Sequence, residues 1–155
     1  TAGGTIDKTY FDRLSTYQVA EPCAETVLRD ARVTCDYAII SLVQKDSLDM
    51  TDEDRKVLKE HICKDECTRI VVTHGTDTMV ETARSLRDIP GKTICLTGAL
   101  APARFRETDA SFNIGCAVTA VQILPPGVYI TMNGRVFPAD KVKKDREKGC
   151  FIRQD

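Results

Sequence analysis

Strand-like and helix-like segments alternate along this chain. Apolar residues at helical spacing predict helices at residues 24–31, from 51 onward, at 78–87 and at 110–123. Apolar and β-branched runs predict strands at residues 33–43, 69–73, 93–97 and 128–132. Because parallel strands need crossover connections, this order predicts an α/β fold with a three-layer, mostly parallel sheet, helices on both faces and a flavodoxin-like or Rossmann-like arrangement.

Local signals refine this outline. Thr51 and Asp54 are spaced as in a capping box, which predicts a helix start. The least regular stretches, residues 7–22 and 133–155, are predicted to be a lid and a tail. The strand that would deliver Gly3, Gly4 and Thr5 to their turn is expected upstream of Thr1.

Composition limits the classes of partner. The 22 Lys and Arg residues nearly balance the 23 Asp and Glu residues, so the net charge of −1 predicts no attraction to nucleic acid or to an anionic membrane. No apolar run approaches the roughly 20 residues that a membrane-spanning helix needs. The 155 residues, 42% of them hydrophobic, are expected to form one domain, residues 1–155.

The seven cysteines are expected to be free thiols, because an odd number cannot all pair and several fall inside predicted elements. Free thiols favour a reducing, cytoplasmic compartment. Cys63 and Cys67 share a predicted helix face, but no matching ligands lie near them in the sequence, so no metal site is predicted.

Three loops that carry hydroxyl groups are predicted to meet at one edge of the sheet. Thr5 follows the expected upstream strand, Ser47 follows the next predicted strand, and Thr76 follows the one after that. Ligands of open parallel sheets bind at the carboxyl ends of the strands. A threonine hydroxyl needs a base or a lysine to become a nucleophile, and His74 is the histidine at this position.

The same residues allow other interpretations. Thr76 and Asp77 belong to residue types that cap helices. The glycines before Thr5 could hold a phosphate at a helix start, although the segment lacks the ending of a P-loop. Thr1 could act as an amino-terminal nucleophile with its own amine as the base.

Several motifs point to a known family. Ala2-Gly-Gly-Thr-Ile6 and Thr73-His-Gly-Thr-Asp-Thr-Met79 resemble the two threonine signatures of bacterial-type L-asparaginases, in their amino-terminal domain. Residues 46–50 are similar to the loop that supplies a substrate-binding serine. Further segments with this resemblance are residues 96–100 with Pro102, 109–113, and 132–133 with 142–144.

The resemblance implies an amidohydrolase that releases ammonia from asparagine or a related small amide. It implies that Thr5 attacks the side-chain amide carbon and that Tyr17 on the lid assists, with Tyr10 as the rival for that role. No metal or organic cofactor is implied.

A second triad is also implied, made of Thr76, Asp77 and Lys144. In this triad Lys144 helps to deprotonate a hydroxyl group or water, and Asp77 also holds the substrate ammonium. The resemblance further implies a substrate-binding set, in which the serine binds the substrate carboxylate. Its members are Ser47, Asp46, Gly75, Gly4 and Ala99.

Two departures from the family pattern affect the expected assembly. Leu100-Ala101 replaces the Met-Arg pair of the family, and two-domain members add a carboxy-terminal domain that contacts the substrate of a neighbouring subunit. We therefore expect a homo-oligomer. The alternatives are an ammonia-generating subunit of a transfer-RNA-dependent amidotransferase, and a catalytically weak module that binds an acidic amino acid or its amide.

Overall fold

The computed structural model describes residues 1–11 and 16–154, and its centre is a four-stranded sheet in the order β3-β4-β5-β6. The first three strands run parallel, and β6 is antiparallel to β5. This arrangement confirms the predicted α/β fold with a mostly parallel sheet. The strands are β3 (Arg69–Thr73), β4 (Thr93–Thr97), β5 (Gly127–Met132) and β6 (Arg135–Pro138).

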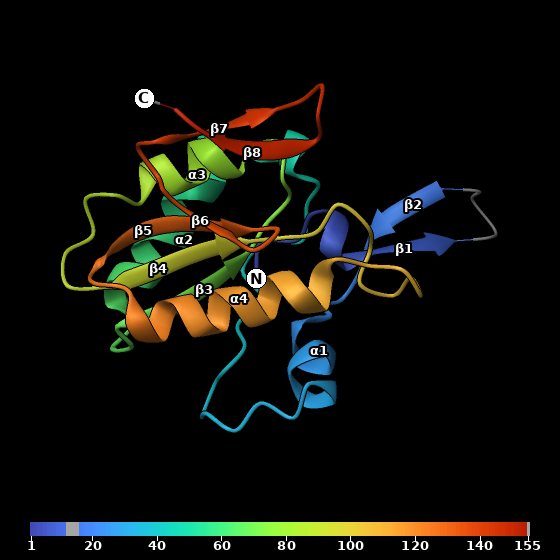
Figure 1. Ribbon diagram of the computed structural model, residues 1–155, viewed down its shortest axis with the longest axis horizontal. Coiled ribbons are helices and arrows are strands. Elements are labelled where there is room, and N and C mark those ends of the chain that lie inside the picture. The colour runs from blue at the N-terminus through green and yellow to red at the C-terminus, as the bar shows by residue number, and fades with distance from the viewer. Residues whose placement is uncertain (12–15, 155) are drawn as a thin grey trace.

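Helices cover both faces of this sheet (Figure 1). α4 (Ala110–Ile123) lies on one face, with the short α1 (Ala24–Asp30) against it, while α2 (Asp52–Lys64) and α3 (Met79–Ser85) lie on the other. β4 is buried along its whole length, and three consecutive apolar residues, 94–96, form its centre between two threonines. Among the described helices, none has the length and apolar character that crossing a membrane would require.

The start of α2 follows the sequence prediction. The Thr51 hydroxyl accepts a hydrogen bond from the Asp54 backbone N–H, and the Asp54 carboxylate accepts one from the Thr51 N–H. This reciprocal arrangement confirms the capping box.

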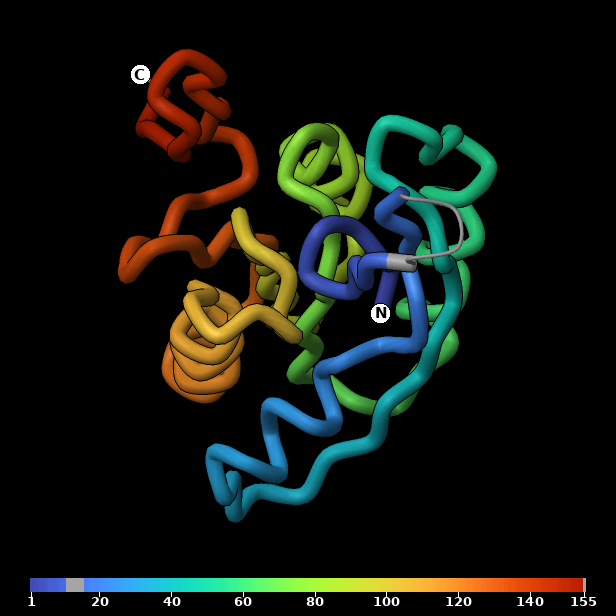
Figure 2. Tube along the Cα trace, turned by 90° about the vertical axis from the view of Figure 1, so that its right-hand side faces the viewer, coloured from blue at the N-terminus to red at the C-terminus, as the bar shows by residue number. Residues whose placement is uncertain are grey.

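Residues 33–43 do not form the predicted strand. They run as irregular chain beside β3, separated from it at one end by the amino-terminal residues (Figure 2). Leu42 N–H donates to the Thr1 carbonyl, and no β-ladder includes this segment within the described residues. A strand needs a neighbour for its backbone groups, and among the described residues Thr1 alone bonds to the backbone of residues 34–43.

Both stretches predicted to be least regular contain strands; the tail prediction was wrong, whereas the lid stays a prediction. The lid region contains a hairpin of β1 (Lys8–Phe11) and β2 (Thr16–Val19), which projects beyond the sheet (Figure 1). In the supposed tail, β6 is followed by a second hairpin of β7 (Val142–Asp145) and β8 (Cys150–Arg153).

The signal missed in the tail is Asn133-Gly134. Both residues have positive φ, 50° and 76°, and they join β5 to the antiparallel β6 in a two-residue turn. Asn-Gly is the typical sequence of such a turn.

Candidate active site

The three hydroxyl-bearing loops meet at the carboxyl end of β3. A Cβ atom added to Gly4 would lie 2.3 Å from the Gly75 backbone nitrogen, and one added to Gly75 would lie 2.4 Å from Ser47 Oγ. Glycine is therefore required at both positions, because a side chain would separate the loops. This contact places the loops of Thr5, Ser47 and Thr76 side by side.

Hydrogen bonds hold the Ser47 loop between its neighbours. The Gly4 N–H donates to the Lys45 carbonyl at 3.0 Å, and Thr78 Oγ1 donates to the Ser47 carbonyl at 2.7 Å. The Asp46 carboxylate accepts from the Leu48 N–H and pairs with the Lys8 ammonium. Asp46 thus stabilises the loop itself, and its binding of substrate stays a prediction.

Lys144 joins the two predicted residues of the β3–α3 loop. Its Nζ donates to Thr76 Oγ1 at 2.8 Å and to Asp77 Oδ1 at 2.7 Å. Lys144 lies on β7, in the region predicted to be a tail, so the fold assembles this triad across distant parts of the chain. A partly exposed ion pair contributes at most about 1 kcal/mol to stability, which leaves the lysine and the carboxylate free to serve binding or chemistry.

The capping interpretation of Thr76 and Asp77 does not match this geometry. α3 begins at Met79, its N-cap residue is Thr78, and the Thr78 side chain makes no capping hydrogen bond. Both side chains bond to the lysine instead.

Thr5 begins a short 3-10 turn, Thr5–Asp7, directly after the Gly4–Gly75 contact. Its side chain is half-buried, whereas the next two residues are buried. The Asp7 carboxylate accepts hydrogen bonds from Cys23 N–H at 2.9 Å and from Cys23 Sγ at 3.1 Å, and burial raises the pKa of Asp7. The turn is therefore anchored from within, while Thr5 keeps some access to solvent.

The two candidate tyrosines lie opposite each other on the β1–β2 hairpin. Tyr10 pairs with Tyr17 in register, and their ring centroids are 5.3 Å apart. Tyr17 also lies 6.1 Å from the ring of Phe105, in the loop after β4. Both tyrosines are about half exposed, so their geometry does not choose between them.

His74 is a structural residue and does not have the exposure that a catalytic base needs. It is fully buried, and burial lowers its pKa to about 4. Its Nδ1 lies 2.7 Å from the Gly75 carbonyl and its Nε2 2.9 Å from Thr82 Oγ1. A neutral ring donates to the first and accepts from the second, which fixes the turn before Thr76.

Sequence reasoning missed Asn113 as a positioning residue. This side chain is fully buried, donates to the Gly98 carbonyl at 3.0 Å and accepts from the Asn133 N–H at 2.9 Å. It holds the loop of Ala99, a residue that is buried as a whole, and the binding of substrate by Ala99 stays a prediction. Asn113 follows Asp109 by four positions, and this spacing was the available signal. The Asp109 carboxylate holds the same loop, because it accepts a hydrogen bond from Leu100 N–H.

No three His, Cys, Asp or Glu side chains in residues 1–11 and 16–154 are grouped as a metal ion would require. The polar groups at the loop junction are instead a cation, a carboxylate, hydroxyls and backbone donors. Such a set suits a small zwitterionic ligand with an ammonium and a carboxylate.

The chain is similar in sequence and in fold to several known proteins. The chain is 34% identical over 112 residues to L-asparaginase 2-3 of Saccharomyces cerevisiae, covering 68% of this chain and 31% of that protein. It is 28% identical over 142 residues to the glutaminase-asparaginase of Acinetobacter glutaminasificans, covering 84% of this chain and 43% of the relative. It superposes on the thermostable L-asparaginase from Thermococcus kodakarensis with a TM-score of 0.81 at 27% identity, covering 98% of this chain and 49% of that one.

The chain thus spans about a third to a half of the length of these relatives. The family model described as asparaginase, N-terminal, matches residues 1–150. This match covers nearly the whole sequence and includes all the loops of the candidate site. The chain belongs to the asparaginase family and corresponds to the amino-terminal domain of its members.

Proposed function

We propose that this chain carries out the hydrolysis of the side-chain amide of asparagine or a related small amide, releasing ammonia, with Thr5 as the nucleophile. The observation that carries the proposal is the bridge from Lys144 to Thr76 and Asp77, next to the contact of Gly4 with Gly75. These two features bring a threonine turn beside a lysine and a carboxylate in one small region.

The chemistry has two steps. The Thr5 oxygen attacks the amide carbon, its proton passes to the leaving nitrogen, and the C–N bond breaks, so that ammonia departs and an acyl-threonine ester remains. Water then attacks the ester and releases the acid. Lys144, in its contact with Thr76, helps to move protons in either step, and Tyr17 assists Thr5. Backbone N–H groups at the glycine contact would stabilise the oxyanion, a contribution of about 3 to 4 kcal/mol in other enzymes.

The substrate is proposed from charge complementarity. The Asp77 carboxylate suits the substrate ammonium, and the Ser47 loop offers donors for its carboxylate. The name of the Acinetobacter relative joins glutaminase and asparaginase activities. One methylene in a packed pocket shifts selection by only about 1 to 3 kcal/mol, so both amides belong in the first assays.

The domain organisation, the assembly and the location of the chain are part of the proposal. We propose one domain for residues 1–155, a homo-oligomer in which a second copy completes the site, and a cytoplasmic location. The free thiols of the seven cysteines are compatible with a reducing compartment. A mass measurement in solution tests the oligomer, with a fully active monomer as the contradicting result.

An ammonia-release assay tests the function directly. We expect Thr5→Ala and Lys144→Met to lose turnover while still binding aspartate in calorimetry. Thr5→Ser should retain part of the activity, and Lys143→Met, on the exposed neighbouring position of β7, should behave as the unmodified protein. If the unmodified chain binds aspartate but releases no ammonia from any amide, the weak binding module is the better account.

A further inference from the structure

The β7–β8 hairpin carries Lys144 but does not belong to the central sheet. Within residues 1–11 and 16–154 it forms a two-stranded sheet of its own, so no backbone ladder fixes its position against the strands β3 to β6. Figure 1 shows the hairpin beside α3, and α3 and β7 are in contact. The position of the lysine therefore depends on the side chains that join this hairpin to α3.

Apolar packing holds the hairpin on the molecule without fixing its exact position. Val142 is fully buried in the main core, and so is Phe151, which lies opposite Lys144 on β8. Residues two apart on a strand point to the same face, so Lys144 points to the side of Val142, whereas Lys143 points away and is exposed. Hydrophobic contacts are non-directional, so they do not set the lysine at hydrogen-bonding distance from a particular acceptor.

Arg84, on α3, supplies directed bonds to this hairpin. Its Nε donates to the Ala139 carbonyl at 3.4 Å, and its Nη2 donates to the Val142 carbonyl at 3.1 Å and to Gln154 Oε1 at 3.2 Å. The two carbonyls lie at the entry to the hairpin, and Gln154 follows its exit. One guanidinium group thus ties both ends of the hairpin to one point on α3. Its planar fork suits this task, because its N–H groups are held in fixed directions.

The same helix also carries the acceptors of the lysine. α3 has seven residues and begins at Met79, two residues after Asp77. Lys144 Nζ donates to Thr76 Oγ1 at 2.8 Å and to Asp77 Oδ1 at 2.7 Å. One short helix therefore follows the acceptor loop at its first end and holds the strand of the donor near its last residue, Ser85.

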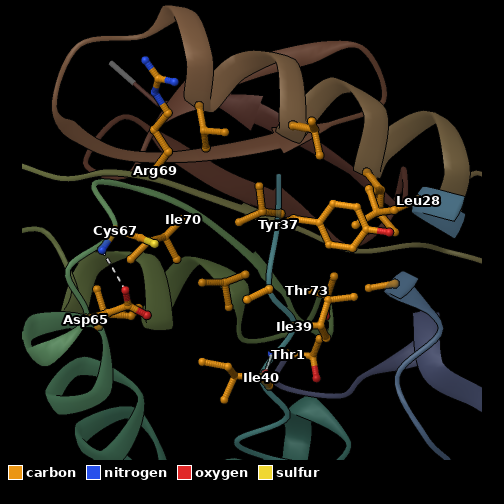
Figure 3. Close-up of a pocket in the computed structure, with 18 of the residues that line it drawn as sticks. Thr1, Leu28, Tyr37, Ile39, Ile40, Asp65, Cys67, Arg69, Ile70 and Thr73 are labelled. Carbon is orange, nitrogen blue, oxygen red and sulfur yellow. Dashed lines mark hydrogen bonds between the residues drawn. The ribbon is translucent and has the colours of Figure 1, made fainter. Parts of the chain in front are cut away.

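The apolar cavity beside β3 has no part in this connection. Its volume is about 310 Å³, and Figure 3 shows apolar side chains such as Ile39, Ile40 and Ile70 around it. Neither Arg84 nor Lys144 lines it. A change at Arg84 therefore acts on the hairpin and not on this cavity.

We propose that Arg84 is a positioning residue that sets the Lys144 ammonium against Thr76 and Asp77, by holding both ends of the β7–β8 hairpin on α3. The effect on turnover rests on the proposed function, whereas the effect on the geometry of the lysine does not. Without the guanidinium group the hairpin keeps its apolar packing but loses its directed bonds. The lysine then spends part of the time out of reach of its acceptors, and a misplacement of about 1 Å can cost about 100-fold in rate.

The test compares Arg84→Met with Arg87→Met in the whole chain. Methionine keeps much of the apolar stem of arginine and removes the N–H donors. Arg87 is also exposed and lies three positions later, so it controls for the loss of one positive charge near the end of α3. The first measurement is steady-state ammonia release from asparagine. The second is the rate at which acetic anhydride acetylates Lys144, followed by mass spectrometry at low extents of labelling, with the exposed Lys143 as internal reference.

The Lys144 side chain is 13% exposed, so loosening of the hairpin should make it more reactive. We expect Arg84→Met to raise the acetylation rate of Lys144 relative to Lys143 by about 5-fold or more. It should lower kcat by about 10- to 100-fold and change the affinity for aspartate by less than about 2-fold. Arg87→Met should leave all three quantities within about 2-fold of the unmodified protein. A merely structural arginine would lower the unfolding temperature and leave the acetylation ratio and kcat of the folded protein unchanged, and this result would overturn the proposal.

Arg84→Lys provides the test if Arg84→Met does not fold. Its ammonium is a compact charge without the fork of arginine, so it cannot reproduce all three bonds. Lys144 should be acetylated about 2-fold faster or more relative to Lys143, and an unchanged ratio would contradict the positioning role. Faster acetylation of Lys144 in either variant, with no ammonia released by any version including the unmodified chain, would keep the positioning role and refute the proposed function instead.

Discussion

The two halves of the candidate site differ in how they are held. On the Lys144 half, Thr76 and Asp77 follow β3, at the edge of the four-stranded sheet, and bond directly to the lysine, with His74 buried next to them. On the Thr5 half, the proposed nucleophile lies on a short 3-10 turn, and the half-exposed Tyr17 lies on a projecting hairpin.

This difference separates two tasks. A side chain fixed by packing and by direct hydrogen bonds is preorganised for charge and proton work, which depends on geometry. A hairpin joined to the sheet by few contacts can adjust as a ligand enters, because local stability falls where buried contacts are sparse. We expect substitutions on the Lys144 half to have larger effects than substitutions on the hairpin.

The largest expected effect is on catalysis by the fixed half. Lys144→Met should lower kcat/KM by about 10²- to 10⁴-fold, the range of general acid–base catalysis. Its unfolding temperature should change little, because the ion pair is partly exposed. Steady-state ammonia release and thermal unfolding measure the two quantities. A large loss of stability with little change in turnover would make the lysine a structural residue.

The second expected effect concerns the contact between the halves. Gly4→Ala should lower the free energy of unfolding by at least about 3 kcal/mol, because its φ of +93° is strained for alanine and its Cβ would meet the Gly75 backbone. Gly91→Ala is the matched control, since its φ is also positive, +70°, but nothing lies within 4 Å of the added Cβ. It should cost about 1 to 2 kcal/mol. Urea unfolding compares the two, and equal costs would mean that the loops do not meet closely.

The third effect is the pH dependence of stability from His74. Burial lowers its pKa to about 4 in the native state, against about 6.5 in the unfolded chain. Between these two pH values the unfolded chain binds one more proton than the native protein. The free energy of unfolding therefore falls by about 1.4 kcal/mol for each unit that the pH falls, and above about pH 6.5 His74 causes no pH dependence. Urea unfolding at pH 7.5 and 5 should give a smaller difference for His74→Gln, because the other titrating groups are common to both proteins. Identical differences would show that the ring is not held neutral.

The smallest effect separates the two tyrosines of the hairpin. Tyr17→Phe should lower kcat/KM by about 10-fold, because it removes the assisting hydroxyl and keeps the ring contact with Phe105. Tyr10→Phe, directly opposite in the hairpin, is the control and should change kcat/KM by less than about 2-fold. The reverse order would assign the assisting role to Tyr10.

Local sequence signals predicted the central elements well. β3, β4 and α4 have the predicted bounds, because each is an uninterrupted apolar or helical pattern with tertiary contacts along its length. The structure of the other segments depends on partners that are distant in the sequence, and local patterns do not reveal these. The segment at 33–43 has the sequence of a strand but forms no β-ladder, and Asn133-Gly134 joins β5 to a strand, β6, in the stretch that was predicted to be a tail.

In the candidate site, too, local sequence signals identified some residues, and distant partners decided the others. The motif around Thr76 indicated a functional loop, and Lys144 was identified only through a family resemblance, because a lysine beside Lys143 carries no local signal. Asn113 and His74 were not assigned their positioning roles, since hydrogen bonds to distant carbonyls leave no periodic pattern. Spatial partners, unlike elements, have to be seen in the fold.

Trapping the acyl intermediate tests the central claim most directly. The protein would be mixed with asparagine, quenched in acid, digested and analysed by mass spectrometry for a peptide that carries an added aspartyl group. Thr5→Ala and Thr76→Val serve as the paired controls. Our account predicts the acyl group on Thr5, present in Thr76→Val and absent in Thr5→Ala. An acyl group on Thr76 would contradict it.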